Sequence, residues 1–269
     1  MPPPSSAPPH TVLVTGASSG IGLELARLFA ADGYRVVLTG RNRRALEDLA
    51  RELTDRHQAT SVVLPRDLAD PKAPDDIFRE LDQAAVAVDV LVNNAGYGVL
   101  GRFAEADLTA QLGMLQVNMA ALTHLTWLAL NRMVPRKAGK ILNVASTAAF
   151  QPGPLLAVYF ATKAYVLSFS EALSEELRSS GITVTALCPG PTQTDFQRRA
   201  GMRETIVMSR GVMTAQAVAL AGYRGLMRGQ RLVVPGLQNR ALARAARILP
   251  KPLVLRVVRA IQEPRRPAA

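Results

Sequence analysis

The chain alternates between short runs rich in β-branched residues and amphipathic stretches of helical length. This alternation is typical of a parallel sheet whose strands are joined by crossover helices. The sequence therefore predicts an α/β protein built on a doubly wound sheet of seven strands with helices on both faces. The expected strands are Thr11–Thr15, Arg35–Thr39, Ser61–Pro65, Val88–Val92, Lys140–Ala145, Ile182–Leu187 and Gln230–Val233.

Helices are expected between these runs. They are Ile21–Ala31, Arg43–Arg56, Asp75–Ala85, Leu108–Met133 (one helix or two end to end), Ala157–Ser179 and Thr214–Met227. In doubly wound sheets, ligands lie beyond the carboxyl ends of the strands, near the point where the strand order reverses. The loops that follow the runs are therefore the places to look for a functional site.

Composition narrows the setting of the protein. The chain of 269 residues has one cysteine, Cys188, so it cannot form an internal disulfide, and we expect a cytoplasmic location. No run of about 18 apolar residues offers a membrane span. Residues 1–10 are rich in proline and serine and lack the charged start and apolar run of a secretory signal, so a disordered lead is expected there.

The net charge of +11 is concentrated near the end of the chain. Residues 236–269 form an arginine-rich amphipathic extension beyond a catalytic domain expected at residues 11–235. Such an extension favours peripheral contact with an anionic membrane surface or packing against a partner subunit, and the sequence leaves both open. The three histidines show no ligand spacing, so no metal site is expected.

A glycine-rich turn, Thr-Gly-Ala-Ser-Ser-Gly-Ile-Gly, follows the first expected strand and opens the first helix. Glycines let backbone N–H groups approach an anion, and the positive end of the helix dipole favours a pyrophosphate there. The motif resembles the cofactor loop of the short-chain dehydrogenase/reductase family, which implies a Rossmann-like fold. The expected cofactor-binding residues in this loop are Gly16, Ser18, Ser19, Gly20, Ile21 and Gly22.

Three further segments match the family in order, and the resemblance covers roughly residues 11–234. The fourth strand ends in a sequence similar to the family's Asn-Asn-Ala-Gly signature, and the third is followed by a pair similar to the one that flanks the adenine ring. After the sixth strand comes a loop that resembles the family's nicotinamide-binding loop. The cofactor-binding residues that these matches imply are Asp67, Leu68, Asn94, Ala95, Gly96, Pro189, Gly190, Thr192 and Thr194.

The cofactor type is predicted from the end of the second strand. An NAD enzyme of this architecture usually has an acidic residue there that binds the ribose hydroxyls. Gly40 takes that position here and Arg41 follows it. A guanidinium pairs with a 2′-phosphate that a carboxylate would repel, and Ser18 can add a hydroxyl contact. The sequence therefore predicts NADP(H).

Tyr159 and Lys163 lie four residues apart on an expected helix, so they share a face. A nearby ammonium lowers the pKa of a phenol from its usual value near ~10, which prepares it for proton transfer. Ser146 lies just beyond the fifth strand. The family has the same order of serine, tyrosine and lysine, with an asparagine like Asn118 as a fourth catalytic member.

The resemblance implies a role for each of these four residues. Ser146 donates a hydrogen bond to the substrate oxygen and Tyr159 moves the proton. Lys163 lowers the tyrosine pKa and binds the nicotinamide ribose, so Tyr159 and Lys163 also belong to the cofactor site. Asn118 holds a water that connects Lys163 to solvent.

The expected function is interconversion of a carbonyl and a secondary alcohol on a lipophilic small molecule. Residues 195–211 match the family's lid over the substrate. A fatty 3-oxoacyl reductase is an alternative, and a non-catalytic NADP-binding regulatory or membrane-surface protein is a rival of another class. The charge also suggests nucleic acid, but few aromatic residues interleave with the basic ones, so none is expected to bind. The family's long helices imply a homo-oligomer.

Overall fold

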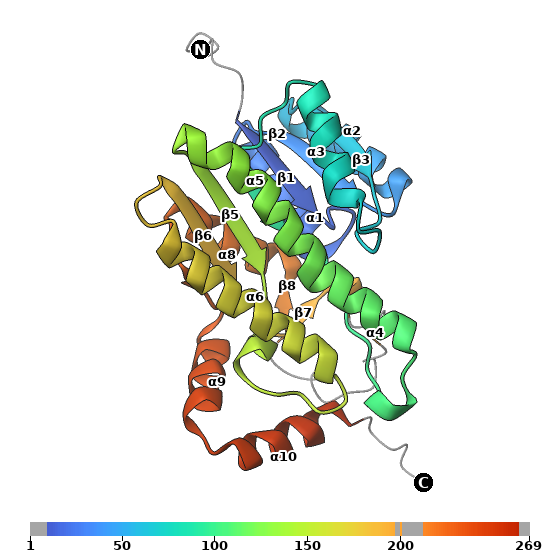
Figure 1. The fold of residues 1–269 in the computed structure, drawn as a ribbon, viewed down its shortest axis with the longest axis vertical. Helices are drawn as coiled ribbons and strands as arrows, with labels where there is room; N and C mark the ends of the chain where they lie inside the picture. The colour runs from blue at the N-terminus through green and yellow to red at the C-terminus, as the bar shows by residue number, and fades with distance from the viewer. Residues whose placement is uncertain (1–9, 197–199, 201–211, 264–269) are drawn as a thin grey trace.

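The protein is described from a computed structural model that covers residues 10–196, 200 and 212–263. A seven-stranded parallel sheet forms its centre, in the order β3-β2-β1-β4-β5-β6-β9 (Figure 1). The predicted fold is therefore confirmed. The strands are β1 (Thr11–Thr15), β2 (Arg35–Gly40), β3 (Ser61–Pro65), β4 (Val90–Asn93), β5 (Gly139–Val144), β6 (Ile182–Leu187) and β9 (Leu232–Val233).

Helices cover both faces of the sheet. One face is packed by α1 (Gly20–Ala31), α2 (Arg43–His57) and α8 (Ala215–Met227). The other face is packed by α3 (Ala73–Gln83), α5 (Leu122–Arg136) and α6 (Ala157–Glu176), with α4 (Leu108–Leu115) beyond them. Figure 1 shows α5 and α6 running side by side across this face.

The core explains why the strands read as continuous apolar runs. Val12 and Val14 of β1 pack toward α1 and α8, whereas Leu13 between them packs toward α3 and α5. Successive strand side chains point to opposite faces, so a strand covered on both sides buries all of them. Strand order reverses between β1 and β4, and the crevice at that reversal lies beside the glycine turn.

Two features depart from the expected elements. The stretch predicted as Leu108–Met133 is divided by a π-helical segment, Gln116–Ala121, between α4 and α5. Two short strands, β7 (Thr192–Gln193) and β8 (Met213–Thr214), pair in a small second sheet. A two-residue strand has no periodicity, so the sequence pattern could not reveal either of them.

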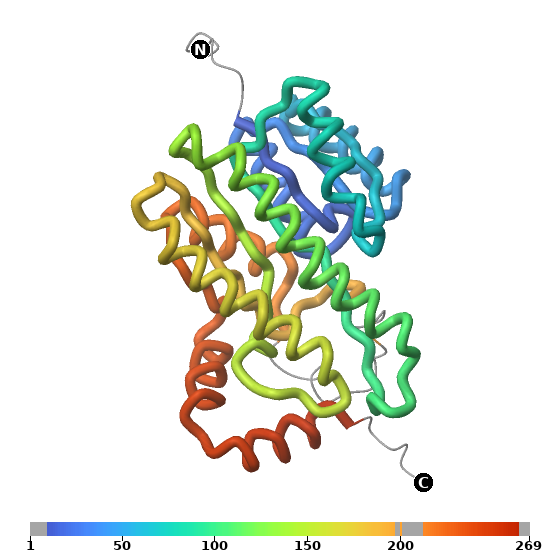
Figure 2. The backbone as a smooth tube through the Cα atoms, viewed as in Figure 1, coloured from blue at the N-terminus to red at the C-terminus, as the bar shows by residue number. Residues whose placement is uncertain are grey.

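The extension folds as two helices, α9 (Leu237–Ile248) and α10 (Lys251–Gln262), separated at Pro250. They lie beyond the carboxyl ends of the strands, at the opposite end of the molecule from the start of β1 (Figure 1). Figure 2 shows α10 beside the segment that joins β5 to α6. No helix in the described part of the chain is long and apolar enough to cross a membrane.

Candidate functional site

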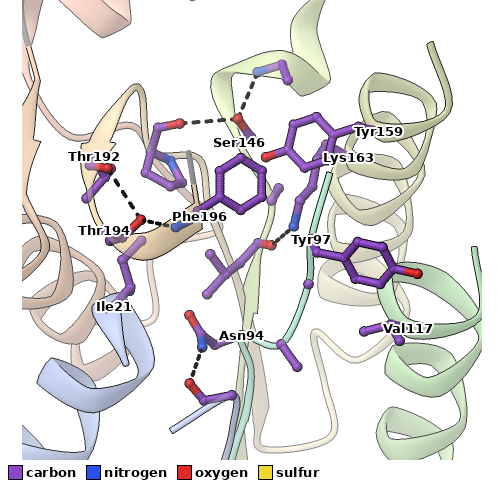
Figure 3. A pocket seen from close by; sticks show the side chains of 18 of the residues that line it. Ile21, Asn94, Tyr97, Val117, Ser146, Tyr159, Lys163, Thr192, Thr194 and Phe196 are labelled. Atoms are coloured by element: carbon purple, nitrogen blue, oxygen red, sulfur yellow. Dashed lines mark hydrogen bonds between the residues drawn. The ribbon is translucent and has the colours of Figure 1, made fainter. Parts of the chain in front are cut away.

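A cavity of about 660 Å³ opens at the carboxyl edge of the sheet, a size typical of small-molecule sites. The loops after β1 to β6 line it, and α6, α9 and α10 add further walls. Of the predicted site residues, Gly22 and Asn118 are absent from its lining. The others all line it, which brings segments from distant parts of the chain together (Figure 3).

The glycine turn has a geometry that requires glycine. Gly16 and Gly20 have φ angles of 65° and 59°, a region that other residues rarely adopt. A Cβ at Gly22 would lie 2.4 Å from Asn94 Nδ2 and 2.5 Å from the Gly16 oxygen. Asn94 Nδ2 donates to the carbonyl of Thr15 at 2.9 Å, so Asn94 holds the turn in place. Gly22 thus serves the cavity indirectly, through close packing.

The start of α1 suits an anion. Ser19 is the residue before the helix, and within the described chain its side chain does not cap the first turn. The first N–H groups of a helix have no acceptor within the helix and carry the positive end of its dipole, which favours an anion there. Ser18, Ser19 and Ile21 line the cavity at this point. A turn without room for side chains and a helix start with free donors together fit a dinucleotide pyrophosphate.

Thr15 organises this end of the site, although sequence reasoning did not select it. Its buried hydroxyl donates to the carbonyl of Val92 at 3.2 Å. The same oxygen accepts hydrogen bonds from the backbone N–H groups of Asn94 and Ala95, both at 2.9 Å. One hydroxyl thus ties β1 to the chain that leaves β4.

The end of β2 carries the groups that would meet a 2′-phosphate. Arg41 is exposed and lines the cavity, together with Ser18. A Cβ at Gly40 would lie 3.6 Å from the Ser18 hydroxyl, an ordinary contact, so Gly40 is not required by packing. Arg66 also lines this end and pairs with Glu80, and the sequence did not single it out. This end is therefore basic.

Asp67 and Leu68 lie on the adjoining wall, as the resemblance implies. The Asp67 carboxylate accepts the backbone N–H of Ala69 at 3.0 Å, which fixes the turn after β3. Leu68 is buried and presents an apolar surface. An apolar side chain beside an oriented carboxylate suits the adenine end of a dinucleotide.

The residues predicted to be catalytic lie where β5 meets α6. Ser146 precedes a short 3₁₀ helix (Thr147–Phe150), and its hydroxyl accepts the N–H of Ala148 at 3.1 Å. Its bond to the Pro189 carbonyl is long, at 3.4 Å. The Lys163 ammonium donates to the Val144 carbonyl at 2.8 Å and lies 5.8 Å from the centre of the Tyr159 ring (Figure 3).

Burial is the main cause of the pKa shifts of Tyr159 and Lys163. It raises the pKa of Tyr159 to about 12, and a hydrogen bond with Ser146 opposes the rise. Burial also lowers the pKa of Lys163 to about 8, and the nearby Cys188 thiol opposes this shift only in part. The expected lowering of the tyrosine pKa by Lys163 is wrong for this geometry. The ammonium is directed at a carbonyl, and desolvation of the phenolate is the larger effect.

Asn118 lies in the π-helical segment, a distortion that is frequent at functional sites. Its Nδ2 donates to the Tyr97 carbonyl and to the Thr162 hydroxyl, both at 3.0 Å, and its Oδ1 accepts the Tyr97 N–H at 3.1 Å. A Cβ at Gly96 would lie 3.0 Å from that Oδ1 and 3.5 Å from Lys163 Nζ. Asn118 thus lies beside the lysine, while its predicted hold on a water stays a prediction.

The loop after β6 closes the site from the other side. Thr192 and Thr194 line the cavity, and a Cβ at Gly20 would lie 3.0 Å from Thr194 Cγ2. This loop therefore touches the glycine turn. A Cβ at Gly190 would lie 2.4 Å from Asn239 Oδ1, so the buried Asn239 of α9 packs directly on the loop.

The far wall of the cavity comes from residues that sequence reasoning did not assign to the site. Phe196 lies in the expected lid, its ring 5.3 Å from that of Tyr159; residues 197–199 and 201–211 of the lid fall outside the described residues. The extension supplies the rest of the wall, and its pattern was assigned to outward contacts alone. The residues it contributes are Asn239, Leu242, Ala243, Val258, Ile261 and Gln262.

Comparison with known proteins assigns this chain to a protein family. Residues 10–205 match the family model for the short chain dehydrogenase. Sulfoacetaldehyde reductase 2 of Chromohalobacter salexigens is 38% identical over 187 residues, which are 69% of this chain and 73% of that protein. The chain therefore belongs to the short-chain dehydrogenase family and is an oxidoreductase.

Two solved structures resemble the whole fold. A short-chain dehydrogenase from Sphingobium yanoikuyae in complex with NADPH has a TM-score of 0.80 and 34% identity, over 88% of this chain and 93% of that one. The bulky-bulky ketone specific alcohol dehydrogenase from Comamonas testosteroni has a TM-score of 0.76 and 29% identity, over 88% and 91%. The similarity extends beyond the residues matched by the family model.

Proposed function

We propose that the protein is an NADP(H)-dependent oxidoreductase that interconverts a carbonyl and a secondary alcohol on a lipophilic small molecule. This proposal rests on the observation that the predicted catalytic residues and the glycine turn line one cavity. Ser146, Tyr159 and Lys163 line the same space as the glycine turn, so a dinucleotide held at the turn and a substrate beside Tyr159 would meet.

Each side chain has a task that its surroundings support. NADPH, when bound, supplies the hydride. The Tyr159 phenol, which burial keeps in its protonated form, donates a proton to the substrate oxygen. The Ser146 hydroxyl donates to the Pro189 carbonyl over a long distance of 3.4 Å, so its proton can turn toward the substrate oxygen. Lys163 places a positive charge nearby, 5.8 Å from the centre of the Tyr159 ring.

NADP(H) is preferred in this proposal because of the charge at the end of β2. Arg41 and Arg66 line the cavity there, and the last position of β2 is Gly40 rather than an acid. A 2′-phosphate would gain charge-assisted hydrogen bonds from a guanidinium. The NADPH complex of the Sphingobium relative supports the same choice.

The substrate end is apolar. Leu156 and Phe160 are buried beside Tyr159, and Phe196 covers the phenol ring. Val258 and Ile261 of α10 also line the cavity, and Val258 packs in the same cluster as Leu156 and Phe160. An apolar space of this kind favours a hydrophobic body on the substrate. The Comamonas relative, named for bulky ketones, supports a large carbonyl compound.

The first test compares NADPH and NADH binding by the wild type, Arg41→Ala and Arg43→Ala. Arg43 is the matched control, because it is exposed, pairs with Glu47 and does not line the cavity. The emission of the reduced nicotinamide serves as the signal, since the single tryptophan, Trp127, lies exposed on α5 and away from the cavity. We expect Arg41→Ala to weaken NADPH binding at least tenfold and leave NADH binding unchanged. Equal binding of both cofactors by the wild type would refute the preference.

The second test is turnover. The wild type is expected to oxidise NADPH in the presence of bulky aryl or alkyl ketones. Tyr159→Phe, which keeps the ring and removes the hydroxyl, is expected to lose at least a hundredfold in kcat while it binds NADPH normally. Normal turnover by Tyr159→Phe would remove the tyrosine from the mechanism.

We also propose a cytoplasmic location with peripheral contact of the extension at an anionic membrane. Residues 236–269 carry eight basic residues and one acidic residue, so they hold seven of the eleven net charges. Ile248, Leu249 and Leu253 are exposed between these cations. Sedimentation with phosphatidylglycerol vesicles is expected, and none with phosphatidylcholine vesicles. Equal behaviour on both would exclude this contact.

We also propose a homo-oligomer, because helices α4 and α5 expose large apolar side chains. Trp127 of α5 and Leu108 and Leu112 of α4 are large apolar side chains that are more than half exposed. A second copy packed on these helices would bury them. Light scattering is expected to show an oligomer that Trp127→Glu converts to a monomer. A monomeric wild type at micromolar concentration would refute this assembly.

A further inference from the structure

Helix α10 buries one stripe of side chains, and the last residue of this stripe is polar. Val254, Val258 and Gln262 follow one another at four-residue spacing, and all three are buried. The two valines pack with Leu156 and Phe160, in the same cluster as Tyr159. Gln262 lies one turn further along and lines the cavity. The helix thus extends an apolar wall that ends in a carboxamide.

The carboxamide oxygen of Gln262 lacks a hydrogen-bond partner among the described residues, although the side chain is only 5% exposed. Buried polar atoms are nearly always paired, because water is lost from them without replacement. A leucine or methionine would complete the stripe without this penalty. A partner that arrives with the ligand would satisfy the atom at the cavity wall.

The position of Gln262 sets where that partner belongs. Val258 belongs to the cluster that surrounds Tyr159, and Gln262 lies about 6 Å beyond it along the helix. The reacting carbonyl must lie at Ser146 and Tyr159. A group that reaches Gln262 therefore belongs to the other end of the substrate, past its apolar body.

We propose that Gln262 is a specificity-determining residue that accepts a hydrogen bond from a hydroxyl or amide N–H at the end of the substrate remote from the reacting carbonyl. This rests on the proposed carbonyl reduction. A carbonyl oxygen accepts and does not donate, so the unpaired Oε1 selects a donor. The substrate class is then a ketone or aldehyde with an apolar body and a distal hydroxyl or amide.

The test uses straight-chain methyl ketones of increasing length, each paired with an analogue in which the terminal methyl is replaced by hydroxymethyl. The ratio of kcat/KM for the two members of a pair reports recognition of the distal group. Gln262→Met removes the acceptor and keeps the shape, whereas Gln262→Glu keeps an acceptor. Gln238→Met, on the exposed side of α9 and outside the cavity lining, is the matched control.

We expect one range of chain lengths in which the wild type prefers the hydroxylated ketone. In that range Gln262→Met should lower the preference roughly 3- to 10-fold, the effect of one lost hydrogen bond. The loss should fall on the hydroxylated ketone, while its methyl partner keeps or gains activity. Gln262→Glu and Gln238→Met should keep the preference, and NADPH binding and the melting temperature of Gln262→Met should match or exceed those of the wild type.

The possible failures are distinct. If the wild type reduces both ketones of every pair and Gln262→Met leaves their ratio unchanged, recognition by Gln262 is overturned while the proposed function stands. A loss of equal size on both ketones would show a structural role and overturn it too. If the wild type reduces none of the ketones with NADPH, the proposed function fails, and substrate recognition by Gln262 fails with it.

Discussion

Two threonines that face each other in the sheet give a sharp test of how the cofactor end is held. Thr15 and Thr39 are register partners on β1 and β2, and both are essentially unexposed. The Thr15 hydroxyl makes three hydrogen bonds, two of them to the N–H groups of Asn94 and Ala95. Within the described chain, the Thr39 hydroxyl makes none. Replacement of each by valine keeps the shape and removes only the hydroxyl.

The expected magnitudes follow from these partners. Thr15→Val leaves the N–H of Ala95 without its acceptor, at about 1–3 kcal/mol for a fully buried donor, whereas the N–H of Asn94 keeps the Val92 carbonyl at 3.1 Å. Ala95 lies on a partly exposed segment, so we expect a loss of about 1–2 kcal/mol in the free energy of unfolding. Thr39→Val removes a buried hydroxyl that has no described partner, so it is expected to be neutral or stabilising.

Urea unfolding of the wild type and both variants measures this difference, and NADPH affinity gives a second readout. Thr15→Val should also weaken NADPH binding, because Asn94 holds the glycine turn. Thr39→Val should bind NADPH normally. If the two variants have free energies of unfolding within about 0.5 kcal/mol of each other, hydrogen bonding by Thr15 does not hold this end of the site.

Two further predictions concern the lysine and the glycine turn. Lys163→Met should abolish turnover yet raise the free energy of unfolding at pH 7. Burial lowers the pKa of Lys163 to about 8, so the folded wild type binds the lysine proton less tightly than the unfolded chain does. The gain in the free energy of unfolding, measured with urea, should therefore shrink as the pH rises from about 8 toward the pKa of lysine in the unfolded chain. A gain that is constant with pH would contradict this assignment. Gly20→Ala should weaken NADPH binding more than tenfold, because its Cβ would lie 3.0 Å from Thr194 at a φ of 59°. Gly33→Ala is the control, since Gly33 has a φ of 79° and no described atom within 4 Å of an added Cβ. It should lose about 1 kcal/mol of stability and bind NADPH normally. Equal NADPH affinities in these two glycine variants would show that strain alone, and not the contact with Thr194, governs the effect.

The sheet was predictable from sequence because its strands are buried on both faces. Such strands read as short apolar runs, and β1, β3 and β6 have the predicted bounds. The bounds are less accurate where an apolar run and the hydrogen-bonded ladder differ. The fourth run was predicted to begin at Val88, but β4 begins at Val90, because Val88 is buried outside the ladder.

The site was predictable where residues follow strands or match a motif of the family. Ser146 and Asn94 each lie just past a strand, so sheet topology alone carries them to one edge. Gln262 and Asn239 have no such marker, because an amphipathic stripe shows that a face is buried and not what buries it. The raised pKa of Tyr159 was equally hidden. Its cause is desolvation, which depends on the packing around the ring rather than on the spacing to Lys163.

In the proposed function, cofactor binding and substrate selectivity depend on different parts of the chain. The cofactor end depends on backbone approaches at Gly16 and Gly22 that leave no space for another side chain, so changes there affect every substrate alike. The proposed substrate end is lined by α10, whose Val258 belongs to the cluster that packs against Tyr159 and whose Gln262 lies one turn further along the helix. A substitution on this face of α10 alters the space and polarity around the substrate body and leaves the glycine turn untouched. We therefore expect changes of substrate range without loss of NADPH binding to map to α10.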